Sequence, residues 1–210
     1  MKIYQWWNGS VPGDGYARFR NSERKTNSYI FMEGKPLPFD SGLPNWKETL
    51  QDPKDYDLLY TYFYDEKKLK SYACMPNNGQ APLVNQKVLD ILLDLCPDEF
   101  QYFPVTIVGE NPKHPPFENH DYFLINICQT VDGIDKFQTD LQYLDKDLGG
   151  AAYGIEGDLF LKAKLPYFNM ARDETLASHI YVAEPLVKAF KKAKINGVKF
   201  ELLGETTFVE

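Results

Sequence analysis

The feature that most constrains the fold of this chain is a local sequence pattern that occurs twice. The first copy begins at 83–85 and ends in the apolar run 100–105. The second copy begins at 181–183 and ends at 198–202, so that matching positions lie 98 residues apart without a gap. The matching pairs are Val84 and Val182, Val88 and Leu186, Leu89 and Val187, Leu92 and Phe190, and Tyr102 and Phe200. Each copy predicts a short extended segment, an amphipathic helix and a strand.

Capping and helix-ending residues support one helix in each copy, at about 85–96 and 184–194. Asn85 precedes the first apolar turn and is a candidate N-cap, because its side chain is able to accept a backbone N–H. Pro185 lies in the first turn of the second helix, where the missing N–H of proline costs nothing. Gly197 follows that helix and is predicted to end it.

Apolar and aromatic runs predict the remaining strands. They lie at 3–7, 28–32, 100–108, 122–128, 133–137, 159–165 and 198–203. The run 122–128 is almost continuously apolar, which favours a central strand, whereas the aromatic run 57–64 fits a helix or a strand. Strands and helices mix without the alternation of a doubly wound sheet. The predicted fold class is therefore α+β, with a mixed, largely antiparallel sheet that carries two main amphipathic helices.

Proline residues suggest a division of the chain near residue 80. Four prolines, at 36, 38, 44 and 53, interrupt any long element in this part of the sequence, and the helix and strand signals strengthen only after Pro82. We predict a loop-rich N-terminal β segment over residues 1–80, packed on a main α+β domain over residues 81–210.

The charge and the cysteine content limit which classes of partner and which cellular compartment we expect for the protein. The 210 residues include 30 acids and 23 bases, a net charge of −7 that repels phosphate backbones, so we expect no nucleic-acid partner. No apolar stretch is long enough to cross a membrane, and the N-terminus lacks the apolar core of a signal peptide. The three cysteines are widely spaced, which favours free thiols over a disulfide framework. We expect a cytoplasmic protein.

Motifs for catalysis and for cofactors are absent from the sequence. His114, His120 and His179 stand apart from one another and from the cysteines, so no metal site is expected. No nucleophile elbow or phosphate-binding glycine loop occurs, and Cys128 at the end of an apolar strand has the character of a structural thiol. Asn126, inside the same apolar run, is predicted to be structural, because a buried amide must be hydrogen-bonded. We expect no catalytic residues, no metal and no cofactor.

Two surface features are candidates for binding a partner. The segment 139–158 concentrates acids and tyrosines against one lysine; its candidate contact residues are Asp140, Tyr143, Asp145, Asp147, Tyr153, Glu156 and Asp158. This composition fits a solvated loop or a patch for a basic protein, where charge speeds encounter and aromatic rings anchor. Trp6 and Trp7 are neighbours in a strand and cannot both face one core, so one ring is predicted to be exposed, as an interface anchor or under another element.

Residues about 80–205 resemble a bacterial immunity-protein family of polymorphic toxin systems, formerly known as a domain of unknown function. The resemblance rests on the order and spacing of Pro82-Leu83-Val84-Asn85, Phe100-Gln101-Tyr102-Phe103-Pro104-Val105, Tyr122-Phe123-Leu124-Ile125-Asn126, Val131-Asp132-Gly133-Ile134-Asp135, His179-Ile180-Tyr181-Val182 and Gly197-Val198-Lys199-Phe200. Asn85 and Ala183 depart from the family pattern, which tends to place a small hydroxyl residue before the helix.

The resemblance implies a protein without enzymatic activity that binds and blocks a cognate toxin. In such systems a secretion apparatus delivers the toxin between competing bacteria. A cytoplasmic inhibitor favours a toxin with a cytoplasmic target, and the charge of −7 favours a basic toxin. Two alternatives stay open: a small cytoplasmic hydrolase that uses carboxylates in an N-terminal cleft, and a structural module that associates with its own copies through Trp6 or Trp7.

Overall fold

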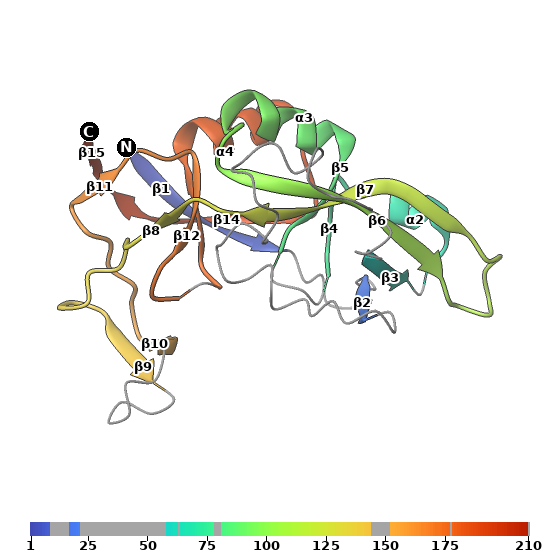
Figure 1. Ribbon diagram of the computed structural model, residues 1–210, viewed down its shortest axis with the longest axis horizontal. Helices are drawn as coiled ribbons and strands as arrows, with labels where there is room; N and C mark the ends of the chain where they lie inside the picture. The colour runs from blue at the N-terminus through green and yellow to red at the C-terminus, as the bar shows by residue number, and fades with distance from the viewer. Residues whose placement is uncertain are drawn as a thin grey trace, which may run out of the picture.

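Two larger β-sheets with a shared helical cover make up most of the protein (Figure 1). The computed structural model describes residues 1–8, 17–21, 58–62, 64–77, 81–143, 152–176 and 178–209. The five-stranded sheet has the order β14 (Val198–Glu205), β1 (Lys2–Asn8), β13 (Ile180–Ala183), β12 (Met170–Asp173) and β8 (Thr130–Val131). The six-stranded sheet has the order β2 (Arg18–Asn21), β3 (Leu58–Tyr62), β6 (Phe100–Gly109), β7 (Glu118–Ile127), β5 (Leu83–Asn85) and β4 (Cys74–Met75).

Smaller elements complete the described chain. Two two-stranded sheets pair β9 (Asp140–Tyr143) with β10 (Ala152–Glu156), and β11 (Lys164–Pro166) with β15 (Thr207–Val209). The helices are α2 (Glu66–Lys70), α3 (Gln86–Leu95) and α4 (Glu184–Lys192). Figure 1 shows α3 and α4 side by side on one face of the larger sheets. The ammonium of Lys87 in α3 donates to the backbone carbonyl of Ala193, the residue that follows α4, at 2.6 Å.

The repeated sequence pattern corresponds to two structural units with the same topology. One unit is β5–α3–β6 and the other is β13–α4–β14. In the first unit β7 lies between the two strands and is antiparallel to both, and in the second unit β1 takes that place. Each unit is thus a helix crossover between parallel strands that are separated by one antiparallel strand. The two units differ in where the middle strand lies in the sequence: β7 follows the first unit, whereas β1 precedes the second.

The helix ends confirm Asn85 as the N-cap of α3, but the prediction that Gly197 ends α4 is wrong, because α4 ends at Lys192 with Ala193 as its C-cap. The side chain of Asn85 accepts the backbone N–H of Val88 at 3.2 Å and starts α3. Ala183 gives α4 no side-chain cap, and the proline in its first turn removes one N–H that would need a partner. Gly197 has φ +80°, and an added Cβ there would lie 1.7 Å from the carbonyl oxygen of Cys74, so only glycine fits this close approach.

The largest apolar core lies under both helices and joins the two units. Its helical part comes from the matched positions of the repeat, Val88, Leu89 and Leu92 in α3 and Leu186, Val187 and Phe190 in α4. Trp6 of β1 packs edge-on against Phe190 and Phe200, with ring centroids 5.3 and 5.6 Å away. Burial of each such side chain stabilises the fold by about 1.5–3 kcal/mol, so the helices and the sheets stabilise one another.

Glu99 ties the first unit to the start of β12, the strand that pairs with β13 of the second unit. It follows α3, and its two carboxylate oxygens accept the backbone N–H groups of Asn169 and Met170 at 2.7 and 2.6 Å. Burial raises the pKa of Glu99 to about 7, against the effect of these two donors, which favour the carboxylate.

Asn196 makes the reciprocal tie from the second unit to the first. It follows α4, and its side-chain oxygen accepts the N–H of Ala73 at 2.8 Å while its backbone carbonyl accepts the N–H of Cys74 at 3.0 Å. Ala73 and Asn169 hold equivalent places, because each accepts the N–H of the residue that precedes its unit's helix, Asn85 or Ala183. The fourth residue beyond each helix therefore binds the strand that pairs with the first strand of the opposite unit, β12 or β4.

Several sequence predictions need correction. Within the described residues the strands form two larger and two small sheets rather than one, because no strand of the first unit pairs with a strand of the second. The segments 133–137 and 159–165 are not strands; they share one isolated bridge, Ile134 with Leu161, and β11 begins only at Lys164. The ambiguous run at 57–64 contains the strand β3, and the predicted strand at 28–32 lies outside the described residues.

The described parts of the N-terminal segment belong to the larger sheets. Strand β1 lies inside the five-stranded sheet, and β2 and β3 extend the six-stranded one. A domain boundary near residue 80 remains a prediction.

We expect the stability of the protein to depend on pH through Glu99. Its pKa is raised in the folded state above the unfolded value of about 4.3, so the folded protein binds this proton more tightly. The stabilisation that comes from protonated Glu99 is fully present below the unfolded pKa and is lost as pH rises through about 7. Urea unfolding of wild type and Glu99→Gln at several pH values from mildly acidic to neutral measures this contribution. The free energy of unfolding should fall more steeply with pH in wild type than in the variant. Parallel pH profiles for the two proteins would contradict this role.

Asn85→Ala should lower the free energy of unfolding by about 1 kcal/mol, because the N–H of Val88 loses its cap. Gln86→Ala is the matched control, since this neighbouring side chain is exposed and bonds only to Asp90 on the helix surface. We expect a change within about 0.5 kcal/mol for the control. Equal losses in chemical denaturation would show that the cap contributes nothing specific.

Candidate partner-binding site

An antiparallel two-stranded arm, formed by β9 and β10, extends away from the larger sheets (Figure 1). We name β9, β10 and the residues up to Asp158 the acidic arm. Asp140 and Glu156 are exposed and directly opposite each other in its ladder. Like charges at such positions repel, so this pair is unfavourable in the isolated protein. A basic partner would relieve that repulsion.

The structure places the predicted contact residues as follows. Asp140, Glu156 and Asp158 are exposed, and the backbones of Tyr143 and Tyr153 lie in β9 and β10. Asp145 and Asp147 lie outside the described residues.

The two adjacent tryptophans face opposite sides of β1, as strand alternation predicts. Trp6 is 2% exposed and belongs to the core under α4, so it does not offer a surface contact. The prediction of Trp6 as a contact residue is therefore wrong for the folded chain. Trp7 is 45% exposed, which leaves its ring as the anchor candidate of the pair.

A hollow of about 500 Å³ lies between the end of the acidic arm and the face of the sheet that carries Trp7. We name it the Trp7 hollow; its lining includes Trp7, Asp158, Phe160, His179, Glu201 and Leu203. Two features that are far apart in the sequence, the exposed tryptophan and the acidic segment, thus meet at one site. The sequence analysis did not predict three of the lining residues as part of a partner-binding site, because no local pattern links them to the tryptophans or to the acidic segment. These residues are Phe160, His179 and Glu201.

The ring of Trp7 is held in place by the neighbouring strand. Its indole Nε1–H donates to Oε2 of Glu201 at 3.1 Å, across the β1–β14 pair. Lys199, directly opposite Trp7 in the ladder, lies 3.7 Å from the same oxygen. The indole N–H is therefore satisfied while much of the aromatic face stays accessible to a ligand.

His179 lines the same hollow in its neutral form at neutral pH. Burial lowers the pKa of its imidazole, more than the nearby carboxylate of Asp173 raises it. Its Nδ1 lies 3.3 Å from the hydroxyl of Ser178. The ring adds a polar group to the lining without adding a positive charge.

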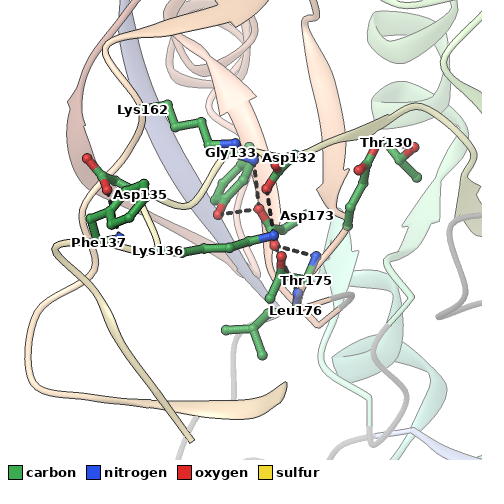
Figure 2. Close-up of polar contacts among 12 residues, drawn as sticks. Thr130, Asp132, Gly133, Asp135, Lys136, Phe137, Lys162, Asp173, Thr175 and Leu176 are labelled. Carbon is green, nitrogen blue, oxygen red and sulfur yellow. Dashed lines mark hydrogen bonds and ion pairs between the residues drawn. The ribbon is translucent and has the colours of Figure 1, made fainter. Parts of the chain in front are cut away.

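A buried carboxylate, Asp173, organises the chain behind this site (Figure 2). One oxygen accepts the N–H of Gly133 at 3.0 Å and the hydroxyl of Tyr181 at 3.1 Å. The other accepts the N–H groups of Thr175 and Leu176 at 2.8 and 2.9 Å. Four donors compensate for the burial of the charge and tie three chain segments together.

The segment 131–135, one of the motifs behind the family resemblance, is structural in this network. Burial alone would raise the pKa of Asp132, but ion pairs with Lys162 and Lys136 hold it below its usual range. Asp135 accepts the N–H of Phe137 at 3.0 Å and shapes the turn that leads into β9 (Figure 2). The motif therefore anchors the base of the acidic arm to the five-stranded sheet.

Asn126 has the structural role that the sequence predicts. It is fully buried in β7 and donates to the side-chain oxygen of Gln101 on the paired strand at 3.0 Å. Among the residues that the structure describes, no three His, Cys, Asp or Glu side chains are grouped so that they could hold a metal ion. No helix in the described part of the chain is long and apolar enough to cross a membrane.

Comparison with known families assigns the chain. The sequence model of an immunity protein family, Imm11, matches residues 18–205. The protein belongs to the Imm11 immunity protein family. The family resemblance predicted from the sequence is confirmed, and the match begins in β2, well before the segment 80–205 from which it was recognised. No curated protein matches the chain.

The Imm11 match includes most of the candidate site. Asp158, His179 and Glu201 lie inside the matched span, whereas Trp7 in β1 precedes it. Membership supports an immunity function against a toxin and a non-enzymatic role.

Gly133→Ala should destabilise the protein by about 1–3 kcal/mol, since the new Cβ would lie 2.6 Å from the ring of Tyr181. The displacement should also loosen the base of the acidic arm, which hydrogen exchange would detect as faster exchange in β9. Gly204→Ala is the matched control, because an added Cβ there meets nothing within 4 Å. Equal stability of both variants would contradict the tight packing at Gly133.

Proposed function

We propose that this Imm11 protein binds a cognate bacterial toxin and neutralises it by occluding the toxin's functional surface. The observation that carries the proposal is the convergence of exposed acids on the arm with an exposed, oriented tryptophan at one hollow. Interfaces of this kind use aromatic anchors for affinity and charged rims for rate and register.

The toxin in this proposal is basic. Asp140, Glu156, Asp158 and Glu201 lie on or beside the same site, within a chain of net charge −7. A cationic surface would be attracted over a Debye length of about 8 Å at physiological salt and would relieve the repulsion between Asp140 and Glu156.

We place this inhibition in the bacterial cytoplasm, within a polymorphic toxin system used in interbacterial competition. In this setting a secretion system delivers the effector, and the immunity protein meets it after delivery. The toxin then has a cytoplasmic target rather than the cell wall.

Co-expression with the product of the neighbouring upstream gene tests the proposal. We expect stoichiometric capture of that product by the tagged protein, and restored growth of cells that produce both. A candidate toxin that is neither bound nor neutralised would overturn the assignment of this partner. The same product should be screened against the cytoplasmic target classes, nucleic acids and nucleotides, because the proposal predicts activity there.

Neutralising the acidic arm should slow binding. Asp140→Asn with Glu156→Gln removes two charges that face each other in the ladder, and we expect the association rate to fall about three- to ten-fold at low salt, with a flatter salt dependence. Stopped-flow mixing with the captured toxin measures both effects.

Asp94→Asn with Asp98→Asn is the matched control for net charge. These exposed acids lie at and just beyond the C-terminal end of α3, away from the arm. An equal slowing in both double variants would show that only the total charge matters and would exclude the arm as the interface.

A further inference from the structure

The Trp7 hollow is an open concavity large enough for a single long side chain. Its volume of about 500 Å³ leaves room for a long side chain and its approach. Trp7 and Phe160, from different segments, both contribute rings, and these are 45% and 42% exposed. Such exposed aromatic surface in a concave site is typical of a recognition pocket rather than of core packing.

The charges around the hollow select a cation. Two carboxylates, Asp158 and Glu201, belong to its lining, and His179 is held neutral by burial. None of the described residues that line it is a lysine or arginine. The nearest cation in the same ladder, Lys199, is 3.7 Å from Glu201 and offsets only part of this charge.

The contacts of Glu201 leave part of its carboxylate for a ligand. The indole N–H of Trp7 and the ammonium of Lys199 both approach Oε2. Within the described contacts Oε1 therefore remains as an acceptor next to the exposed indole face. The same contact fixes the ring, so that binding would require little reorganisation.

We propose that the Trp7 hollow receives an arginine side chain of the partner protein. A guanidinium is planar and weakly hydrated, so it stacks on the indole while its N–H fork reaches the carboxylates. An ammonium would satisfy the charge but not the flat aromatic surface. The inference rests on the proposed toxin binding, since it identifies the group that the toxin would insert.

The test uses the full chain and a small probe, N-acetyl-L-arginine amide. The indole N–H resonance of Trp7, assigned with Trp7→Phe, reports binding by nuclear magnetic resonance. We expect a saturable shift with this probe. N-acetyl-L-citrulline amide has nearly the same shape without the charge, and it should bind at least about ten-fold more weakly.

Matched variants locate the binding. The double variant Asp158→Asn with Glu201→Gln should lower the affinity for the arginine probe by about ten-fold or more, because both carboxylates are lost. Glu205→Gln is the control: it removes one charge from the same strand, at the end of the ladder where Glu205 lies opposite Lys2, and Glu205 does not line the hollow. No saturable shift, equal binding of the citrulline probe, or equal weakening by the control would each overturn the inference.

Growth rescue separates this inference from the proposed function. If Asp158→Asn with Glu201→Gln binds and neutralises the toxin as wild type does, the toxin inserts no arginine here, while immunity stands. If the arginine probe binds as expected but the wild-type chain neutralises no toxin, the hollow is a guanidinium site and the proposed function fails.

Discussion

Two side chains, one beyond the end of α3 and one beyond the end of α4, connect the two halves of the repeat. Glu99 and Asn196 each accept backbone amides at the start of a strand that pairs with the opposite unit, β12 or β4, and each lies four residues beyond the end of its helix. These contacts set how the two helices lie beside each other and therefore how the shared core closes. Because β12 and β13 are positioned through Glu99, the clamp also fixes the sheet on which Asp173 builds the base of the acidic arm.

Local sequence signals predicted α3 and α4 but not the short helix α2, whereas the sheet arrangement required distant partners. Asn85 acts within three residues, so its role could be inferred from the sequence, whereas Gly197 is required by its close approach to the distant carbonyl of Cys74. By contrast, Ile3 pairs with Ala183 on one side and Gly204 on the other, and no local pattern encodes such a choice. The same limit explains the predicted strand at 133–137. Its apolar residues serve an anchored turn, not a ladder.

The candidate site was predicted only in part. Strand alternation correctly predicted one exposed tryptophan, and charge density directed attention to Asp140, Glu156 and Asp158. Glu201 and His179 gained their significance only from β14 and β13, which bring them beside the exposed ring. Conversely, the acids at 132 and 135 have structural partners, which shows that a recognisable family motif need not contact a ligand.

The position of β1 has a consequence for synthesis in the cell. Strand β1 is completed by β13 and β14, so the ribosome must synthesise the chain as far as β14 before β1 has both of its neighbours. Until then Trp6 and Trp7 are both uncovered on the nascent chain, and Trp7 lacks Glu201. A chain that ends before β14 would therefore present aromatic surface to chaperones and proteases, and it would lack the Trp7 hollow, because Glu201, Leu202 and Leu203 of β14 belong to its lining.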